Sequence, residues 1–366
     1  MSHAPGYDRL MKWTSVPIMP TPAGEGTMFR VFAESHNVNL IGVGLGGATT
    51  NVYSIYDGKF VRSVSANLGM SYSIYNVMKE AGLKNILRWL PFKIEEKDVL
   101  NILRNKMIRP TTIPQTLERL IIEHAVAREA LRMGFKHHKS LARPLSGAKR
   151  KEKGVELYDA IDFTQTYIDL MKVNWIAGTG GLLSHAPRRV QSAMILIDGF
   201  QPEGVTRLFQ DSVFMIPHLG VLSTIHRKAS LEIFEKDCLI MLGTCISFRG
   251  HLKNGYGKKV ADITIEIPDR EVINEVLTYG TIRRIPLKAG VSAQVDIRPV
   301  REFRVEAGGG MSRRLVAKVD GGEAGIIIDA RGRPLELPED DEERKKTLIK
   351  WLTELEAYPE EYIKNL

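Results

Sequence analysis

Two adjacent glycines followed by two threonines stand between two apolar runs, residues 40–45 and 52–55. Because glycine has no Cβ atom, the backbone amides of Gly46 and Gly47 can approach an anion closely, and Thr49 and Thr50 add hydroxyl donors. This pattern is typical of a hairpin that binds phosphate. A two-glycine hairpin without any ligand is the alternative that these residues leave open.

A second glycine turn, Gly178-Thr179-Gly180-Gly181, follows a short apolar run and precedes a helix expected to begin around Pro187. Arg188 and Arg189 fall in the first turn of that helix, where the helix dipole disfavours positive charge unless an anion lies nearby. We therefore expect a nucleotide or another anion near this turn, the alternative being that both arginines extend into water. The spacing differs from G-x-G-x-x-G, so a Rossmann dinucleotide site is not supported.

The strands and helices that position these turns are predicted from the spacing of apolar residues and from the Gly and Pro residues that separate the segments. The first hairpin continues at Asp57-Gly58 into a third strand, which predicts an antiparallel meander. His124 lies on the apolar stripe of the best helix, where a hydrogen-bonded core histidine is favoured over a ligand. Short strands are expected at 205–209 and 213–216, and helices at 71–80, 95–104, 111–134, 187–199 and 230–242.

The 366 residues carry a net charge of +8, and no apolar stretch approaches the roughly 20 residues of a membrane helix. The N-terminus lacks the layout of a signal peptide. With only Cys238 and Cys245 present, neither a disulfide scaffold nor a cysteine-rich zinc site is expected. These features predict a cytoplasmic protein without a metal site.

Part of the positive charge gathers in residues 136–153, which also contain Pro144, Ser146 and Gly147. No aromatic side chains are interleaved there to stack bases. The stretch is interpreted as a solvated surface loop in preference to a nucleic-acid site.

Composition suggests four segments. Three closely spaced prolines in residues 16–22 favour an extended connector within residues 1–35. Short β runs divided by Gly and Pro begin after residue 251, and the acidic run 339–343 is suited to start a helix ending near Tyr358. The expected division is a connector (1–35), a nucleotide-binding lobe (36–250), a separate β domain (251–338, with strands at 260–267, 281–286, 293–297, 315–319 and 324–328) and a C-terminal helix (339–366).

The order of the two glycine turns resembles the second lobe of the actin-like ATPases. A closer resemblance is to the glutamate mutase L family, also called MutL but unrelated to the mismatch-repair protein of that name. The matching segments span nearly the whole chain, and the segment from Gly178 to Arg189 is the most specific. They are 20–22, 45–50, 67–70, 178–189, 201–206, 215–223 and 326–334.

The resemblance implies an α/β protein with an RNase H-like second lobe of an actin-like ATPase, a mainly-β C-terminal domain and a terminal helix. It also implies an accessory protein that reactivates an adenosylcobalamin-dependent glutamate (methylaspartate) mutase or a related mutase, with ATP and Mg²⁺ as cofactors and the mutase subunits as partners. By this likeness the phosphates would contact Gly46, Gly47, Thr49 and Thr50, and adenosine would lie beside Gly178, Gly180, Gly181 and Arg188. No catalytic residue is assigned.

The chain departs from the family pattern in two places. Gly44 and Asn51 stand where the family's hairpin usually carries aspartates, so a carboxylate that would help hold hydrated Mg²⁺ is missing. Nothing before Leu40 matches the Asp-x-Gly loop of a first lobe, so we do not expect this chain alone to hydrolyse ATP well. The chain would then be either an N-terminally truncated product or one subunit whose missing lobe comes from another chain. The alternative function is a non-catalytic module that docks on a mutase or another partner through its β domain and basic loop, or a degenerate, N-terminally truncated family member.

Overall fold

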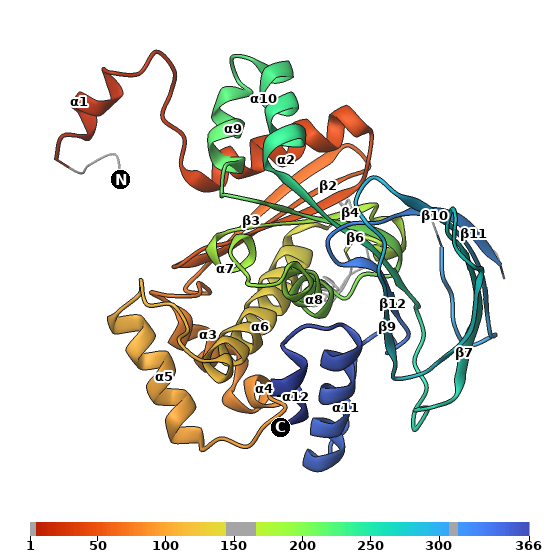
Figure 1. The fold of residues 1–366 in the computed structure, drawn as a ribbon. Helices are drawn as coiled ribbons and strands as arrows, with labels where there is room; N and C mark the ends of the chain where they lie inside the picture. Colours follow the sequence, from red (N-terminus) through yellow and green to blue (C-terminus); the bar gives the residue numbers. More distant parts are fainter. Residues whose placement is uncertain (1–4, 144–165, 307–313, 366) are drawn as a thin grey trace, which may run out of the picture.

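The computed structural model describes residues 5–143, 166–306 and 314–365, and an eight-stranded mixed sheet forms its centre (Figure 1). The strand order is β3-β2-β1-β4-β5-β6-β12-β9. The strands are β1 (Leu40–Leu45), β2 (Thr49–Tyr56), β3 (Lys59–Ala66), β4 (Trp175–Thr179), β5 (Gly204–Asp211), β6 (Leu239–Ser247), β9 (Ile282–Ile285) and β12 (Gly325–Asp329).

The first five strands of this sheet have the RNase H-like arrangement. β1, β4 and β5 run parallel, whereas β2 pairs antiparallel with β1 and β3 antiparallel with β2. All six residues of β1 are buried, as expected for a central strand that is covered on both faces. The predicted α/β class and the predicted meander are confirmed.

Helices cover both faces of the sheet (Figure 1). On one face Phe29 and Phe32 of α2 (Thr21–His36) pack against Tyr53 and Phe209, with α9 (Ile216–Leu222) alongside. The opposite face is covered by α6 (Leu117–Leu141) and α8 (Arg189–Phe200), whose apolar residues join those of β1 and β2 in one core. The other helices are α1 (Tyr7–Met11), α3 (Ile74–Ala81), α4 (Leu83–Leu87), α5 (Glu96–Ile108), η1 (Leu170–Lys172), α7 (Gly181–Ser184), α10 (Arg227–Ile233), η2 (Phe234–Cys238), α11 (Asp341–Glu354) and α12 (Glu360–Lys364).

Helix α2 lies within the segment for which the sequence predicted a connector, so that prediction is wrong for residues 21–35. The helix begins directly after Pro20, and Pro22 is tolerated because the first turn needs no backbone donor from it. Burial of Met28, Phe29 and Phe32 against the sheet stabilises the helix.

The C-terminal β strands do not form a wholly separate domain. Two of the five predicted strands, β9 and β12, extend the large sheet, since β12 pairs with β6 and β9 pairs with β12. The other three predicted strands, with β8 (Ile273–Thr278), which was not predicted, form a second sheet in the order β11-β10-β7-β8. They are β7 (Lys259–Glu266), β10 (Ser292–Pro299) and β11 (Leu315–Asp320).

Several local predictions need correction. Residues 213–215 form a turn rather than a strand, and residue 216 begins α9. Residues 239–242 belong to β6 rather than to a helix. The C-terminal helix ends at Glu354, and a second one, α12, follows it. The basic stretch begins inside α6, and its remainder from residue 144 lies outside the described residues.

His124 is a core residue, as the sequence predicted. Its Nδ1 lies 2.8 Å from the Tyr358 hydroxyl, and burial lowers its pKa to about 3, so the ring is neutral at physiological pH. No helix in the described ranges is both long and apolar enough to cross a membrane.

Candidate functional site

The glycine hairpin is held by a neighbouring loop. The amides of Met70 and Ser71 donate to the carbonyls of Gly46 and Gly47, at 2.9 and 3.0 Å, and the Gly46 amide donates to the Thr49 carbonyl at 3.0 Å. In the described part of the chain, the amides of Gly47 and Ala48 have no hydrogen-bond acceptor. These two donors are therefore the ones that the hairpin can offer to an anion.

The second glycine turn reaches the end of β1 because Gly180 has no side chain. Gly180 adopts φ +109°, and a Cβ atom there would lie 2.2 Å from the carbonyl oxygen of Leu45. No larger residue could adopt this position without moving the backbone. This contact brings Gly181 and α7 next to the hairpin.

A cavity of about 720 Å³ opens between the two glycine turns. Gly46, Gly47 and Gly181 line it, together with the loop from Pro110 to Leu117. Its volume falls within the ordinary range for a small-molecule site. Lys106 also lines the cavity, but its ammonium group lies 3.1 Å from the Glu123 carboxylate, so most of its charge is offset.

The structure places the other predicted phosphate ligands differently. Thr49 is half-buried at the start of β2. Thr50 is fully buried and its hydroxyl donates to the Leu68 carbonyl at 2.6 Å. That hydroxyl is engaged within the protein, and Thr50 therefore supports the hairpin without offering a donor to a ligand.

On the predicted adenosine side, Gly178 is a buried residue of β4, where a Cβ atom would crowd Leu183. The Arg188 guanidinium donates to the carbonyls of Glu356 and Tyr358, at 2.8 and 3.1 Å. Arg189 likewise donates to the Ser184 carbonyl at 2.6 Å. Both arginines have carbonyl partners, so their position in the first turn needs no bound anion to explain it.

A buried carboxylate that sequence reasoning missed lies against Gly44. Gly44 pairs with Asn51 across the hairpin, and a Cβ atom on Gly44 would lie 2.2 Å from Oε2 of Glu25. The Tyr53 hydroxyl donates to this oxygen at 2.6 Å. Burial raises the pKa of Glu25 to about 7. The signal that could have identified Glu25 is its place among the apolar residues on the buried face of α2, which requires that α2 is first predicted as a helix.

These residues do not supply a magnesium site at the hairpin. Gly44 has no ligand atom, Asn51 directs its amide toward Glu25, and Glu25 is only 2% exposed with a hydrogen-bonded oxygen. In the ranges that the structure covers, no cluster of three or more His, Cys, Asp or Glu side chains could hold a metal ion. The Gly47 amide at the cavity suits phosphate, but the hairpin offers no carboxylate to the counter-ion, and the acidic residue that lines the cavity, Glu123, is paired with Lys106.

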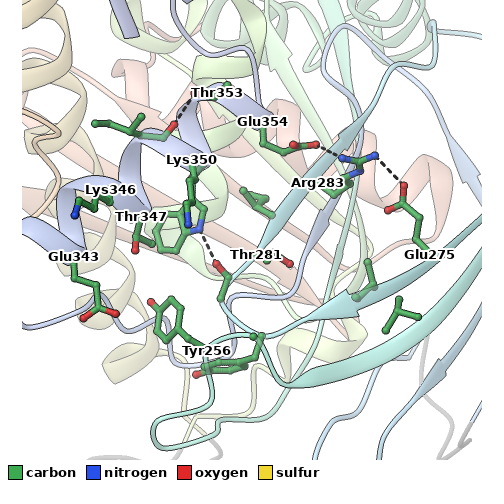
Figure 2. Close-up of a pocket in the computed structure, with 18 residues that line it drawn as sticks. Tyr256, Glu275, Thr281, Arg283, Glu343, Lys346, Thr347, Lys350, Thr353 and Glu354 are labelled. Atoms are coloured by element: carbon green, nitrogen blue, oxygen red, sulfur yellow. Dashed lines mark hydrogen bonds and ion pairs between the residues drawn. The ribbon is translucent and has the colours of Figure 1, made fainter. Parts of the chain in front are cut away.

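A larger cavity, of about 1010 Å³, lies elsewhere, beside β8, β9 and α11 (Figure 2). Neither glycine turn lines it.

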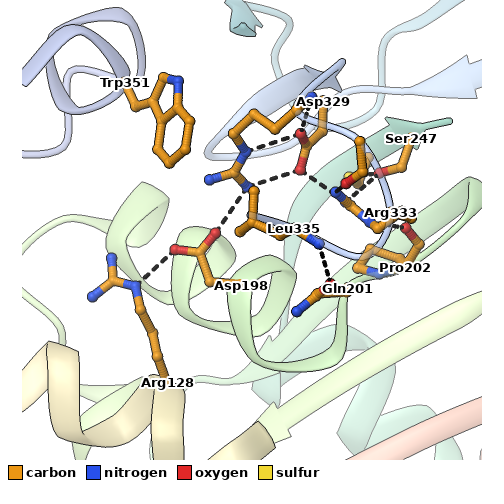
Figure 3. Close-up of polar contacts among 12 residues, drawn as sticks. Arg128, Asp198, Gln201, Pro202, Ser247, Asp329, Arg333, Leu335 and Trp351 are labelled. Atoms are coloured by element: carbon orange, nitrogen blue, oxygen red, sulfur yellow. Dashed lines mark hydrogen bonds and ion pairs between the residues drawn. The ribbon is translucent and has the colours of Figure 1, made fainter. Parts of the chain in front are cut away.

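The segment around Asp329 forms a buried network of ion pairs (Figure 3). Asp329 accepts hydrogen bonds from Arg331 and Arg333, at 2.8 to 2.9 Å from their side chains. Arg331 also pairs with Asp198 of α8 at 2.8 Å, and Arg128 of α6 pairs with the same carboxylate at 2.7 Å. Every member is 5% exposed or less, so the network joins β12 to the two helices under the sheet and is closed to ligands.

Sequence comparison identifies relatives of this chain. The family described as MutL protein matches residues 1–238. Protein MutL of Clostridium tetanomorphum is 27% identical over 250 residues, which cover 60% of this chain and 50% of the relative. The chain thus spans about half the length of that curated relative.

Among solved structures, component A of (R)-2-hydroxyglutaryl-CoA dehydratase from Acidaminococcus fermentans has 10% sequence identity and a TM-score of 0.29, over 61% of this chain and 73% of that one. A score this low carries no functional weight. The family match covers well over half of the sequence, including both glycine turns and the strands that carry them. The chain belongs to the MutL protein family.

Proposed function

We propose that this protein is a nucleotide-binding accessory protein of an adenosylcobalamin-dependent glutamate (methylaspartate) mutase or a related mutase. The observation that carries the nucleotide part is the meeting of two glycine turns at one cavity, which is lined by Gly47, whose backbone amide has no acceptor among the described residues. Family membership supports the mutase part.

In this proposal the phosphates lie against the backbone of Gly46 and Gly47, with the hydroxyl of Thr49 as a further donor. Adenosine lies beside Gly180 and Gly181, with Gly178 behind them as a packing position. Mg²⁺ would enter with the phosphates and be held by them and by water, since the hairpin offers it no carboxylate.

The cobalamin would belong to the partner mutase, and the role of this chain would be to bind nucleotide while it opens the mutase for exchange of damaged cofactor. Two lobes are needed in an actin-like ATPase to position the γ-phosphate and water. Only one sheet of the RNase H-like order occurs in the described residues. Hydrolysis would accordingly depend on a further lobe.

We expect a fluorescent ATP analogue to bind the purified chain with micromolar affinity, and Gly181→Leu to weaken this affinity at least about tenfold. A Cβ atom on Gly181 meets no protein atom within 4 Å, so the new side chain fills the cavity without disturbing the fold. Thr49→Ala should weaken binding by about tenfold as well, by removing one hydroxyl donor. Fluorescence titration measures both effects.

Lys97→Leu, an exposed change on α5 outside the cavity, serves as the control and should leave affinity unchanged. Absence of analogue binding by the folded wild type would refute the nucleotide proposal. Release of inactive cobalamin from a glutamate mutase, measured with and without this protein and ATP, tests the accessory role separately.

The competing function is a non-catalytic module that binds a partner without nucleotide. The pairing of Lys106 with Glu123 favours it, because the cavity then offers a triphosphate little positive charge. Nucleotide-independent release of cobalamin, or nucleotide-independent co-purification with mutase subunits, would support this reading.

A further inference from the structure

The larger cavity is a groove between two sheet edges and a helix. Among the residues that the structure describes, β8 is the end strand of the four-stranded sheet and pairs only with β7, and β9 is the end strand of the eight-stranded sheet and pairs only with β12. The groove runs beside both strands and beside α11 (Figure 2). It lies outside residues 1–238, the part of the chain that matches the family.

The groove is pre-formed by contacts that join its walls. Arg283 of β9 donates to Glu275 of β8 at 2.9 Å and to Glu354 of α11 at 3.0 Å. The indole nitrogen of Trp351 donates to the carbonyl of Gly280, in the turn between the two strands, at 2.8 Å. A groove that is already ordered loses little entropy when a ligand enters it.

The edge of β8 has the properties of a template for another strand. One side of an end strand carries backbone donors and acceptors that have no partner within the sheet. Val276, in the middle of β8, is 60% exposed and lines the groove. An extended peptide that pairs with such an edge satisfies the backbone groups and covers apolar side chains like this one.

The helical wall supplies positive charge. Lys346 and Lys350 of α11 line the groove, both are exposed, and neither has an acidic partner among the described residues. Four residues of helix rise about 6 Å, and alternate side chains of a strand are about 6.6 Å apart. The two ammonium groups therefore match acidic side chains at alternate positions of an extended segment. Glu343 lies one helical turn before Lys346 and also lines the groove, so it would repel any further carboxylate of the segment that lies beside it.

We propose that the groove between β8 and α11 binds an extended acidic segment of a partner protein, which adds as a strand to the free edge of β8 and places alternate carboxylates against Lys346 and Lys350. Recognition then combines backbone pairing on one side with charge on the other. This inference does not depend on nucleotide binding.

Two fluorescein-labelled nine-residue peptides test the proposal with the full chain, one alternating valine with glutamate and the other valine with lysine. By fluorescence anisotropy we expect the acidic peptide to bind with Kd of about 10–100 µM and the basic peptide to bind at least about tenfold more weakly. Lys346→Glu together with Lys350→Glu should weaken the acidic peptide by about tenfold and strengthen the basic one. Lys97→Glu, on α5 away from the groove, should change neither.

Hydrogen exchange locates the bound peptide. The amides of residues 273–278 should exchange more slowly when the acidic peptide is present, since half of them gain a hydrogen-bond acceptor. Equal binding of both peptides, or unchanged binding by the double variant, would overturn the charge match. Binding without protection of β8 would overturn strand addition. A self-associated chain that Val276→Asp converts to monomer in sedimentation experiments would show that a second copy fills the groove instead.

Discussion

Replacing Asp329 with asparagine is expected to lower the free energy of unfolding by about 3–5 kcal/mol. Asp329 is fully buried and neutralises two buried guanidinium groups, those of Arg331 and Arg333. The amide has the same shape but no charge, so both arginines would be left without their main counter-charge in a site that excludes water (Figure 3). Urea unfolding at pH 7 measures the difference.

The effect of this substitution should depend on pH. Burial opposes ionisation of Asp329, but Arg331 and Arg333 outweigh burial and hold its pKa below the usual value of 3.8. A carboxyl with a lowered pKa in the folded state stabilises the protein above its unfolded pKa and loses that contribution as pH falls below it. The free energy of unfolding of the wild type should therefore exceed that of the variant by the same amount down to about pH 4, and by less in stronger acid.

Asp262→Asn is the matched control, because Asp262 pairs with Lys259 on the surface with both side chains about half exposed. This change should lower the free energy of unfolding by less than about 1 kcal/mol. If Asp329→Asn cost no more than the control, the network around Asp329 would not stabilise the fold.

Glu25→Gln is expected to stabilise the protein at pH 8 by about 2–3 kcal/mol more than at pH 4.5. The pKa of Glu25 is about 7 in the folded protein and about 4.5 for an ordinary glutamate. As pH rises through this window the unfolded chain ionises first, so the wild type loses stability between about pH 4.5 and 7 and then levels off. Glutamine does not titrate, and its side-chain oxygen can still accept from Tyr53.

Thermal or urea unfolding of both proteins between pH 4.5 and 8 measures this difference. Glu80→Gln provides the control, since Glu80 is exposed at the end of α3. A Glu25→Gln difference that does not vary with pH would mean that Glu25 ionises as easily in the folded protein as in the unfolded chain.

Local patterns were sufficient where the structure depends on neighbours along the chain. The second turn of the meander was predictable because Asp57 and Gly58 both adopt positive φ, a conformation that few other residue pairs allow. The stripe on α6 and its histidine were predictable because apolar spacing alone decides which side is buried.

Predictions failed where stability comes from distant partners. Helix α2 was missed because its prolines suggested an extended chain, whereas packing of Phe29 and Phe32 on the sheet holds the helix. Strands β9 and β12 were expected in a separate domain. Strand pairing joins segments that are distant in the sequence, and β12 pairs with β6 of the large sheet. Neither result could follow from a window of neighbouring residues.

The sequence by itself determined that this chain is an α/β protein with two glycine turns in a fixed order, because glycine, threonine and apolar periodicity act through local backbone geometry. Only the tertiary structure decided which polar groups remain available. Leu68 engages the hydroxyl of Thr50, the carbonyls of Glu356 and Tyr358 engage Arg188, and Glu25 fills the space beside Gly44. These partners lie 18 to 170 residues away along the chain, and hydrogen bonding of buried groups depends on distance in space alone.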